Sequence, residues 1–171
     1  MATYATTAEA QAYFDARLHE QAWSDASQGD REKALIAATR IIDRLNFKGY
    51  KATVYTYLAS LDDVALADQA EINAASAAQE LQFPRDADTE IPDEILIACY
   101  EIAYALLDEI DPDTELENLA ISSHGYASVR TTYSRSHNPP EHLDAGVPSA
   151  TAWRYLRPFL REPGGITLSR V

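Results

Sequence analysis

The sequence has one cysteine, few glycines and no long apolar run. A single cysteine, Cys99, excludes a disulfide within the chain, and we interpret it as a small buried hydrophobe in a protein assembled in a reducing cytoplasm. No stretch approaches the ~18 consecutive apolar residues of a membrane-spanning helix, so we expect no membrane association. The N-terminus lacks the basic start and apolar run of a signal peptide. The length of 171 residues fits one domain with its own core.

Positive charge is scarce, with 14 Lys and Arg against 27 Asp and Glu, for a net charge of −13. Residues 112–171 are neutral, with six acids and six arginines, so residues 1–111 carry the whole excess. A surface this acidic repels phosphate and leaves no footprint for tight nucleic-acid binding. Arginine suits planar pairing with carboxylates. The distribution therefore predicts contacts between the arginines of the last third and an acidic partner or another copy.

Catalytic motifs are absent as well. The sequence has no phosphate-cradling glycine loop, no Cys-x-x-Cys and no Gly-x-Ser-x-Gly elbow. One cluster suggests a metal site at first: His137, Glu141, His142 and Asp144. Its histidines are five residues apart and enclose Pro139 and Pro140, which excludes the helical i, i+4 pair that zinc prefers. We therefore predict no catalytic residue, no metal and no cofactor, and a protein that is not an enzyme.

Residues 91–110 predict the helix around which the chain is organised. Pro92, Asp93 and Glu94 suit a first helical turn. An apolar stripe follows at three- and four-residue steps: Ile95, Ala98, Cys99, Ile102, Leu106 and Ile110. Asp111-Pro112 ends the helix, because the residue before a proline disfavours helical geometry.

Three more helices are predicted in the first two thirds. The first begins at a capping box of Thr6 and Glu9 and runs to about Trp23. The second covers residues 31–46, capped by Asp30, and a positive φ is expected at Gly49. The third runs from Asp62 or Asp63 to about Leu81, and the Thr, Val and Tyr residues within 50–61 predict a short strand or an ordered loop.

The last third has a different texture. Residues 119–136 predict a β-hairpin or extended loop, Ser149 caps a short helix, and Pro163-Gly164-Gly165 releases a C-terminal arm. The predicted fold is mainly α: a small helical-bundle body, 1–111, with appendages in 112–171 of the same domain. Eight residues of the last third are predicted to make assembly contacts: Arg130, Arg135, Trp153, Arg154, Arg157, Arg161, Ile166 and Leu168.

Three segments together resemble a known family. They are Lys33 to Asp43 with Asn46-Phe47-Lys48-Gly49 after it, Gln79 to Arg85, and Ile91-Pro92 with the helix 94–107. In this order, after an aromatic helix, they resemble the head-to-tail adaptor (connector or head-completion) proteins of tailed bacteriophages, some of which are labelled DnaT-like single-stranded-DNA-binding proteins. The resemblance covers about residues 8–110. Residues 50–78 are longer than in many relatives, and the last third matches only loosely.

The resemblance implies a virion protein of the phage neck, assembled in the host cytoplasm. Such a subunit forms a dodecameric ring that contacts the portal protein and the next neck, tail-terminator or tail protein, and its termini and extended loops grip the portal and the neighbouring subunits. DNA would pass through the ring without tight binding, since an acidic wall repels it. Two alternatives stay open. One is a single-stranded-DNA-binding module, which requires a basic groove with stacking aromatics; the other is a small acidic regulatory or toxin-neutralising protein.

The charge distribution yields a first prediction. The chain should show no salt-sensitive binding to single- or double-stranded DNA, because residues 1–111 hold 21 acids and only eight bases. Fluorescence anisotropy with labelled oligonucleotides checks this. Sub-micromolar affinity that falls steeply between low and physiological salt would contradict it.

Overall fold

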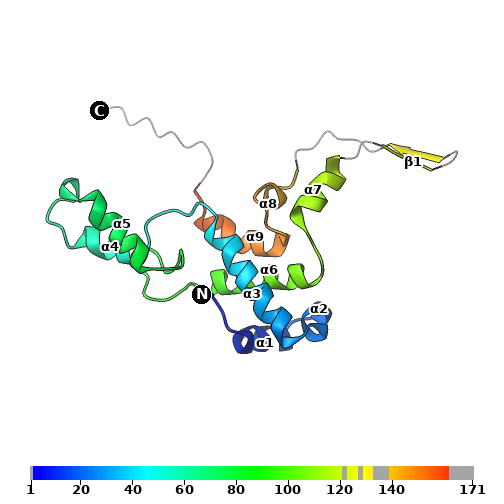
Figure 1. Cartoon of the computed structure of the whole chain (residues 1–171), viewed down its shortest axis with the longest axis horizontal. Coiled ribbons are helices and arrows are strands. Elements are labelled where there is room, and N and C mark those ends of the chain that lie inside the picture. The colour runs from blue at the N-terminus through cyan, green and yellow to red at the C-terminus, as the bar shows by residue number, and fades with distance from the viewer. Residues whose placement is uncertain (1, 121–122, 127–128, 133–138, 162–171) are drawn as a thin grey trace.

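The chain folds mainly into α-helices that form a compact bundle (Figure 1). The computed structural model describes residues 2–120, 123–126, 129–132 and 139–161. The α-helices within them are α1 (Thr7–Asp15), α2 (Gln21–Asp25), α3 (Gln28–Asp43), α4 (Ala52–Ala59), α5 (Gln69–Ala78), α6 (Asp93–Leu107), α7 (Pro112–Ala120), α8 (Glu141–Asp144) and α9 (Ala150–Leu156). Two 3-10 turns, η1 (Val64–Leu66) and η2 (Arg157–Phe159), and an antiparallel pair, β1 (Ser123–Tyr126) and β2 (Val129–Thr132), complete the described elements.

The central helix α6 has the predicted apolar stripe. Ile95, Ala98, Cys99 and Ile102 are fully buried. Desolvation raises the pKa of the Cys99 thiol to about 12, so this side chain is a packing group, as expected. Pro92 is the N-cap rather than the first helical residue, and the helix ends at Leu107, earlier than predicted. Glu109 follows with a φ of 61°, which turns the chain before Asp111-Pro112 is reached.

Helices from both ends of the chain cover α6. Leu35, Ala38 and Ile42 of α3 pack against it, and Phe14 of α1 stacks on Trp23 of α2 with the ring centroids 4.6 Å apart. Three residues of the last third, Val147, Ala152 and Leu156, also belong to this core. The short helix that the sequence suggested as an appendage is thus α9, a layer of the bundle itself.

A buried ion pair joins the N-terminal helix to the centre of α6. Glu101 is only 3% exposed, and Arg17 donates to both of its carboxylate oxygens at 2.9 and 3.0 Å. The Tyr13 hydroxyl donates to the same carboxylate at 2.7 Å. Burial and then this hydrogen bond raise the pKa of Tyr13. The Arg17 guanidinium also lies 4.3 Å from the centre of the Tyr104 ring, so the charge is enclosed on its other side by an aromatic face.

The predicted boundaries near the N-terminus are partly wrong. The capping box of Thr6 and Glu9 is present, but α1 ends at Asp15 and α2 is a separate short helix. Between them the chain turns, with a φ of 59° at His19, and this turn brings Arg17 to Glu101. The next helix begins earlier than predicted, because Ser27 rather than Asp30 is its N-cap and accepts a hydrogen bond from the Asp30 amide.

The prediction of a strand or loop over residues 50–61 is wrong, since 52–59 form α4. A strand there would need a partner, and the described strands pair only with each other. Thr56 bonds back to the Ala52 carbonyl at 2.8 Å, and Thr53 bonds to Ala75 of α5 at 2.6 Å. Side-chain hydrogen bonds and pairing with α5 therefore override the strand propensity. The third predicted helix is correspondingly shorter: Asp68 caps α5, which ends at Ala78.

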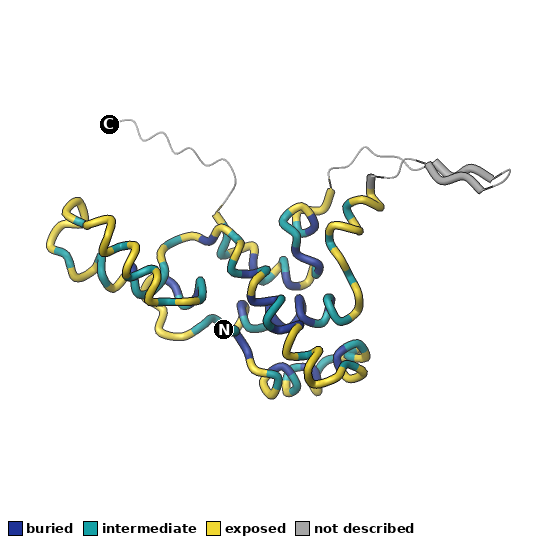
Figure 2. Tube along the Cα trace, viewed as in Figure 1, coloured by how far each residue is buried: buried dark blue, intermediate teal, exposed yellow. Residues whose placement is uncertain are grey.

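Residues 52–78 form a helical hairpin, here called the arm, that projects from one end of the bundle (Figure 1). Figure 2 shows the buried residues gathered in the bundle, whereas the arm is mostly exposed or half-buried. Val54 is the arm's only buried side chain. At the other end of the view, β1 and β2 pair with Gly125 opposite Arg130.

The buried ion pair yields a second prediction. Glu101→Ala should lower the free energy of unfolding by about 3 kcal/mol, since it leaves Arg17 without its buried partner. Urea unfolding followed by circular dichroism measures this. Lys33→Ala is the matched control, because it breaks the exposed pair with Asp30 and should leave the urea midpoint nearly unchanged. Equal midpoints for the two variants would contradict the role given to Glu101.

Candidate assembly interface

The structure describes the side chains of four of the eight predicted contact residues, and these four lie together at the end of the described chain. They are Trp153, Arg154, Arg157 and Arg161, in α9, in η2 and just after it. Arg130 lies in β2, but its side chain is outside the described part. Arg135, Ile166 and Leu168 lie outside the described residues altogether. The assembly interface is therefore built here from α9 and η2.

Arg154 and Arg157 form an exposed basic surface, here called the arginine face. Ser149 caps α9 and fixes its orientation, so that Ala152 and Leu156 are buried and both arginines point outward. Arg154 has no ion-pair partner among the described residues. Arg157 lies 3.3 Å from a carboxylate oxygen of Glu141, with both side chains about two-thirds exposed. An ion pair so exposed contributes little to stability, so both arginines remain able to pair with an incoming carboxylate.

Trp153 borders this surface. Its ring is half-buried against the core, and its indole nitrogen donates to Glu141 at 3.4 Å. The ring thus presents an apolar edge beside two cationic groups. A surface of this kind suits a partner that brings an exposed aliphatic side chain together with carboxylates.

Arg161 behaves differently from the other two arginines. Its guanidinium donates to the Phe47 carbonyl at 3.0 Å and reaches the Gly49 carbonyl at 3.5 Å. The backbone amide of Arg161 donates to Asn46, and Leu160 forms a β-bridge with Phe47. Arg161 therefore fastens the chain after η2 to the loop after α3, which is a structural role within the subunit, and its assembly contact stays a prediction.

The same loop is held from its other side by Arg85, which is 9% exposed. Arg85 donates to the carbonyls of Lys48 and Gly49 at 2.8 and 2.7 Å. Gly49 has a φ of +72°, and a Cβ there would lie 2.0 Å from the Asp86 carboxylate, so only glycine fits.

This contact unites two of the segments that carry the family resemblance. The rings of Phe47 and Phe83 meet edge to face with their centroids 4.7 Å apart. The third segment, α6, packs against α3 at the centre of the core. Packing accounts for the buried residues of these three segments, so a functional role is expected on the exposed surfaces.

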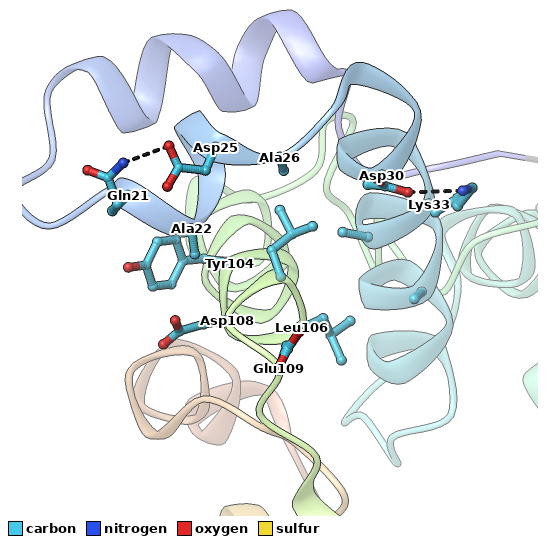
Figure 3. Close-up of a pocket in the computed structure, with 13 residues that line it drawn as sticks. Gln21, Ala22, Asp25, Ala26, Asp30, Lys33, Tyr104, Leu106, Asp108 and Glu109 are labelled. Carbon is cyan, nitrogen blue, oxygen red and sulfur yellow. Dashed lines mark hydrogen bonds and ion pairs between the residues drawn. The ribbon is translucent and has the colours of Figure 1, made fainter.

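A wide groove of about 820 Å³ lies between α2, α3 and the C-terminal end of α6 (Figure 3). Its apolar lining consists mainly of alanine and leucine: Ala22, Ala26, Ala34, Ala37, Leu106 and Leu107. Its acids are Asp25, Asp30, Asp108 and Glu109, with Lys33 as the lone cation. Lys33 bonds to Asp30 at 3.0 Å and holds the pKa of that carboxyl below its usual range. Such a lining rejects anions, and it contains no serine, cysteine or histidine that would act as a nucleophile or base.

No metal site is predicted at His137, Glu141, His142 and Asp144, and the structure describes the last three of these residues. Glu141 bonds to Trp153 and Arg157, and burial lowers the pKa of His142. His137 lies outside the described residues. Within the described residues, no three His, Cys, Asp or Glu side chains are close enough to hold a metal ion. The helices of that same part are too short or too polar to cross a membrane.

Comparisons with protein-family models, with curated proteins and with solved structures give no match to this chain.

The two kinds of arginine yield a third prediction. Arg161→Ala should lower the free energy of unfolding by about 1 kcal/mol, because two backbone carbonyls lose a charged donor. Arg154→Ala removes the same kind of side chain from a site without a partner among the described residues. It should change the free energy of unfolding by less than about 0.5 kcal/mol. Paired urea titrations measure the difference. A larger loss for Arg154→Ala would mean that the arginine face stabilises the free subunit.

Proposed function

We propose that this chain is a structural virion protein that forms a ring connecting the portal to the neck or tail of a bacteriophage. The observation that carries the proposal is a pair of unlike exposed surfaces on one chain. The arm holds four acids and no base over residues 52–78, and the arginine face lies on a different element, α9 and η2. Unlike surfaces on identical subunits favour head-to-tail contacts, and these generate closed rings when the rotation between subunits closes. The family resemblance adds the dodecameric stoichiometry and the place between portal and tail.

The charge of the chain fits passage of DNA through such a ring. The bundle has an acidic groove. Many of the described basic side chains bind carbonyls or carboxylates: Arg17, Arg31, Lys33, Arg44, Lys48, Lys51, Arg85, Arg157 and Arg161. A DNA-facing wall without available cations does not retain the phosphate backbone. The genome would therefore slide past the ring instead of binding to it.

The single-stranded-DNA-binding alternative receives less support from the aromatic side chains. Three tyrosines are engaged inside the bundle, where Tyr4 bonds to Asp43, Tyr13 bonds to Glu101 and Tyr100 packs on Tyr13. Tyr50 and Tyr55 are exposed, but they lie at or in the acidic arm. Stacking platforms for single strands need cations beside the aromatic rings to hold the phosphates.

Native mass spectrometry of the purified chain, alone and with the portal protein encoded nearest to its gene, tests the proposal. We expect a closed ring of identical subunits that is retained on the portal. Monomers in both samples would overturn it. The neighbouring genes give an independent check, since an adaptor gene is expected beside portal and tail genes.

The C-terminal tail, residues 163–171, yields a fourth prediction. Residues 163–171 lie outside the described residues, and the chain before them is already anchored by Arg161 and Leu160. Deleting 163–171 should therefore leave the melting temperature of the subunit nearly unchanged and weaken its retention on the portal, where Ile166 and Leu168 would add to a sheet edge. Calorimetry and co-sedimentation measure the two effects. A large fall in melting temperature would assign the segment to the subunit's own core instead.

A further inference from the structure

We infer that the arm of each subunit binds the arginine face of the next copy, an inference that rests on the ring proposed above. The contact would place the acidic tip of the arm, residues 60–68 with the first turn of α5, against Arg154, Arg157 and the edge of Trp153. The arm has little support within its own chain, its tip exposes two aliphatic side chains, and its carboxylates favour a cationic surface.

The arm has little internal support. Helices α4 and α5 have eight and ten residues, lengths at which an isolated helix is marginal in water. Hydrogen bonds hold the arm at its root, where Lys51 donates to the Ser76 and Gln79 carbonyls at 3.2 and 2.7 Å. The Gln79 side chain accepts from the Thr53 amide at 3.3 Å and donates to the Pro84 carbonyl at 2.9 Å. The root is therefore fixed to the bundle, while the tip extends away from it.

The tip exposes aliphatic side chains, and their exposure does not stabilise a free subunit. Leu66 is 75% exposed and Val64 is 60% exposed. They lie in η1, between the capped ends of α4 and α5, where Asp63 and Asp68 accept hydrogen bonds from Ala65 and Ala70. The capping bonds give the tip a defined shape. Burying these two aliphatic side chains at a partner surface would favour the contact.

Charge selects the surface that the tip contacts. Asp62 and Glu71 are exposed carboxylates that no described side chain pairs, and the arm has no base. The groove between α2, α3 and α6 is acidic, so it repels the arm. The arginine face offers two exposed guanidinium groups and the half-buried Trp153 ring. This surface complements both the carboxylates and the aliphatic side chains of the tip.

The arm cannot satisfy this contact within its own chain. In Figure 1 the tip of the arm lies at one end of the molecule, whereas α9 lies within the bundle. The partner must be a second copy, whose own arm remains available for a third. Each subunit then uses one arm and one arginine face, which is a head-to-tail interface that repeats around a ring.

Charge reversal tests the contact in the wild-type chain and three variants, each assayed by native mass spectrometry with the portal protein present. The arm variant carries Asp62→Arg and Glu71→Arg, which spare the capping residues of η1 and α5. The face variant carries Arg154→Glu and Arg157→Glu. The control carries Asp88→Arg and Glu90→Arg, which change the charge equally on exposed residues of the loop before α6. Circular dichroism confirms that each variant keeps the helical signal.

The expected results distinguish the contact from a general charge effect. The arm and face variants alone should each raise the concentration needed for half-maximal assembly at least about tenfold, while the control stays near wild type. An equal mixture of arm and face variants should assemble again, with the two chains alternating, because each reversed surface then meets an opposite one. Assembly of the arm variant at wild-type concentrations, or no recovery in the mixture, would overturn the inference.

Apolar substitutions at the tip give a second readout. Leu66→Ser should weaken assembly, whereas Leu18→Ser, at a residue 82% exposed in the turn after α1, should not. Equal effects of the two would count against the tip as a contact. If wild type forms a ring and only these variants fail to behave as stated, the ring proposal stands and the arm contact falls. If wild type forms no ring on the portal, the proposed function falls first.

Discussion

The way the N-terminal segment packs against α6 depends on the buried carboxylate of Glu101. Glu101 lies in the middle of α6, where its neighbours in sequence are apolar, and a carboxylate left there without a partner would cost several kcal/mol. Arg17 and Tyr13 compensate it, and both come from the N-terminal segment. The end of α1, the turn through His19 and the position of α2 all follow from the need to bring that guanidinium to α6. A buried pair adds little net stability, but it specifies which helix covers which face of α6.

Arginine has a second structural use in this chain, because several guanidinium groups hold backbone carbonyls at the ends of helices and in loops. Arg31 binds Trp23 and Ser24, Arg44 binds Gly146, and Arg85 and Arg161 converge on the loop at 47–49. Carbonyls at helix ends lack intrahelical donors, so a planar cation with several N–H groups satisfies them efficiently. This use engages guanidinium groups that could otherwise contact other molecules, even where the residue is exposed, as at Arg44. It also makes Arg154, which has no described partner, stand out as a residue for contacts with another molecule.

The helical elements with strong local signals could be predicted from the sequence, and those that depend on distant residues could not. The stripe of α6, the capping box at Thr6 and the Ser149 cap rest on spacing and local hydrogen bonds, and all three are present. Helix α4 was not predicted, because its Thr, Val and Tyr residues favour strands by local propensity. The hydrogen bond to α5 that supports the helix comes from residues distant in sequence. The Glu101 pair was missed although one signal was available: a lone charge in a helix that is apolar on all sides. Of the predicted contact residues, Arg154, Arg157 and Trp153 lie together, and Arg161 also holds the loop at 47–49.

The separation of core and surface limits what the family resemblance explains. Its three segments form the helix pair α3 and α6 and the loop contact between Phe47 and Phe83, which a bundle needs whatever its role. The arm lies where the sequence departs from that resemblance, and Val54 is its only buried side chain. A segment that is long, acidic and weakly supported does not improve the stability of a free subunit. Its fixed root and capped, apolar tip are therefore best explained by a contact with another molecule, formed when subunits assemble.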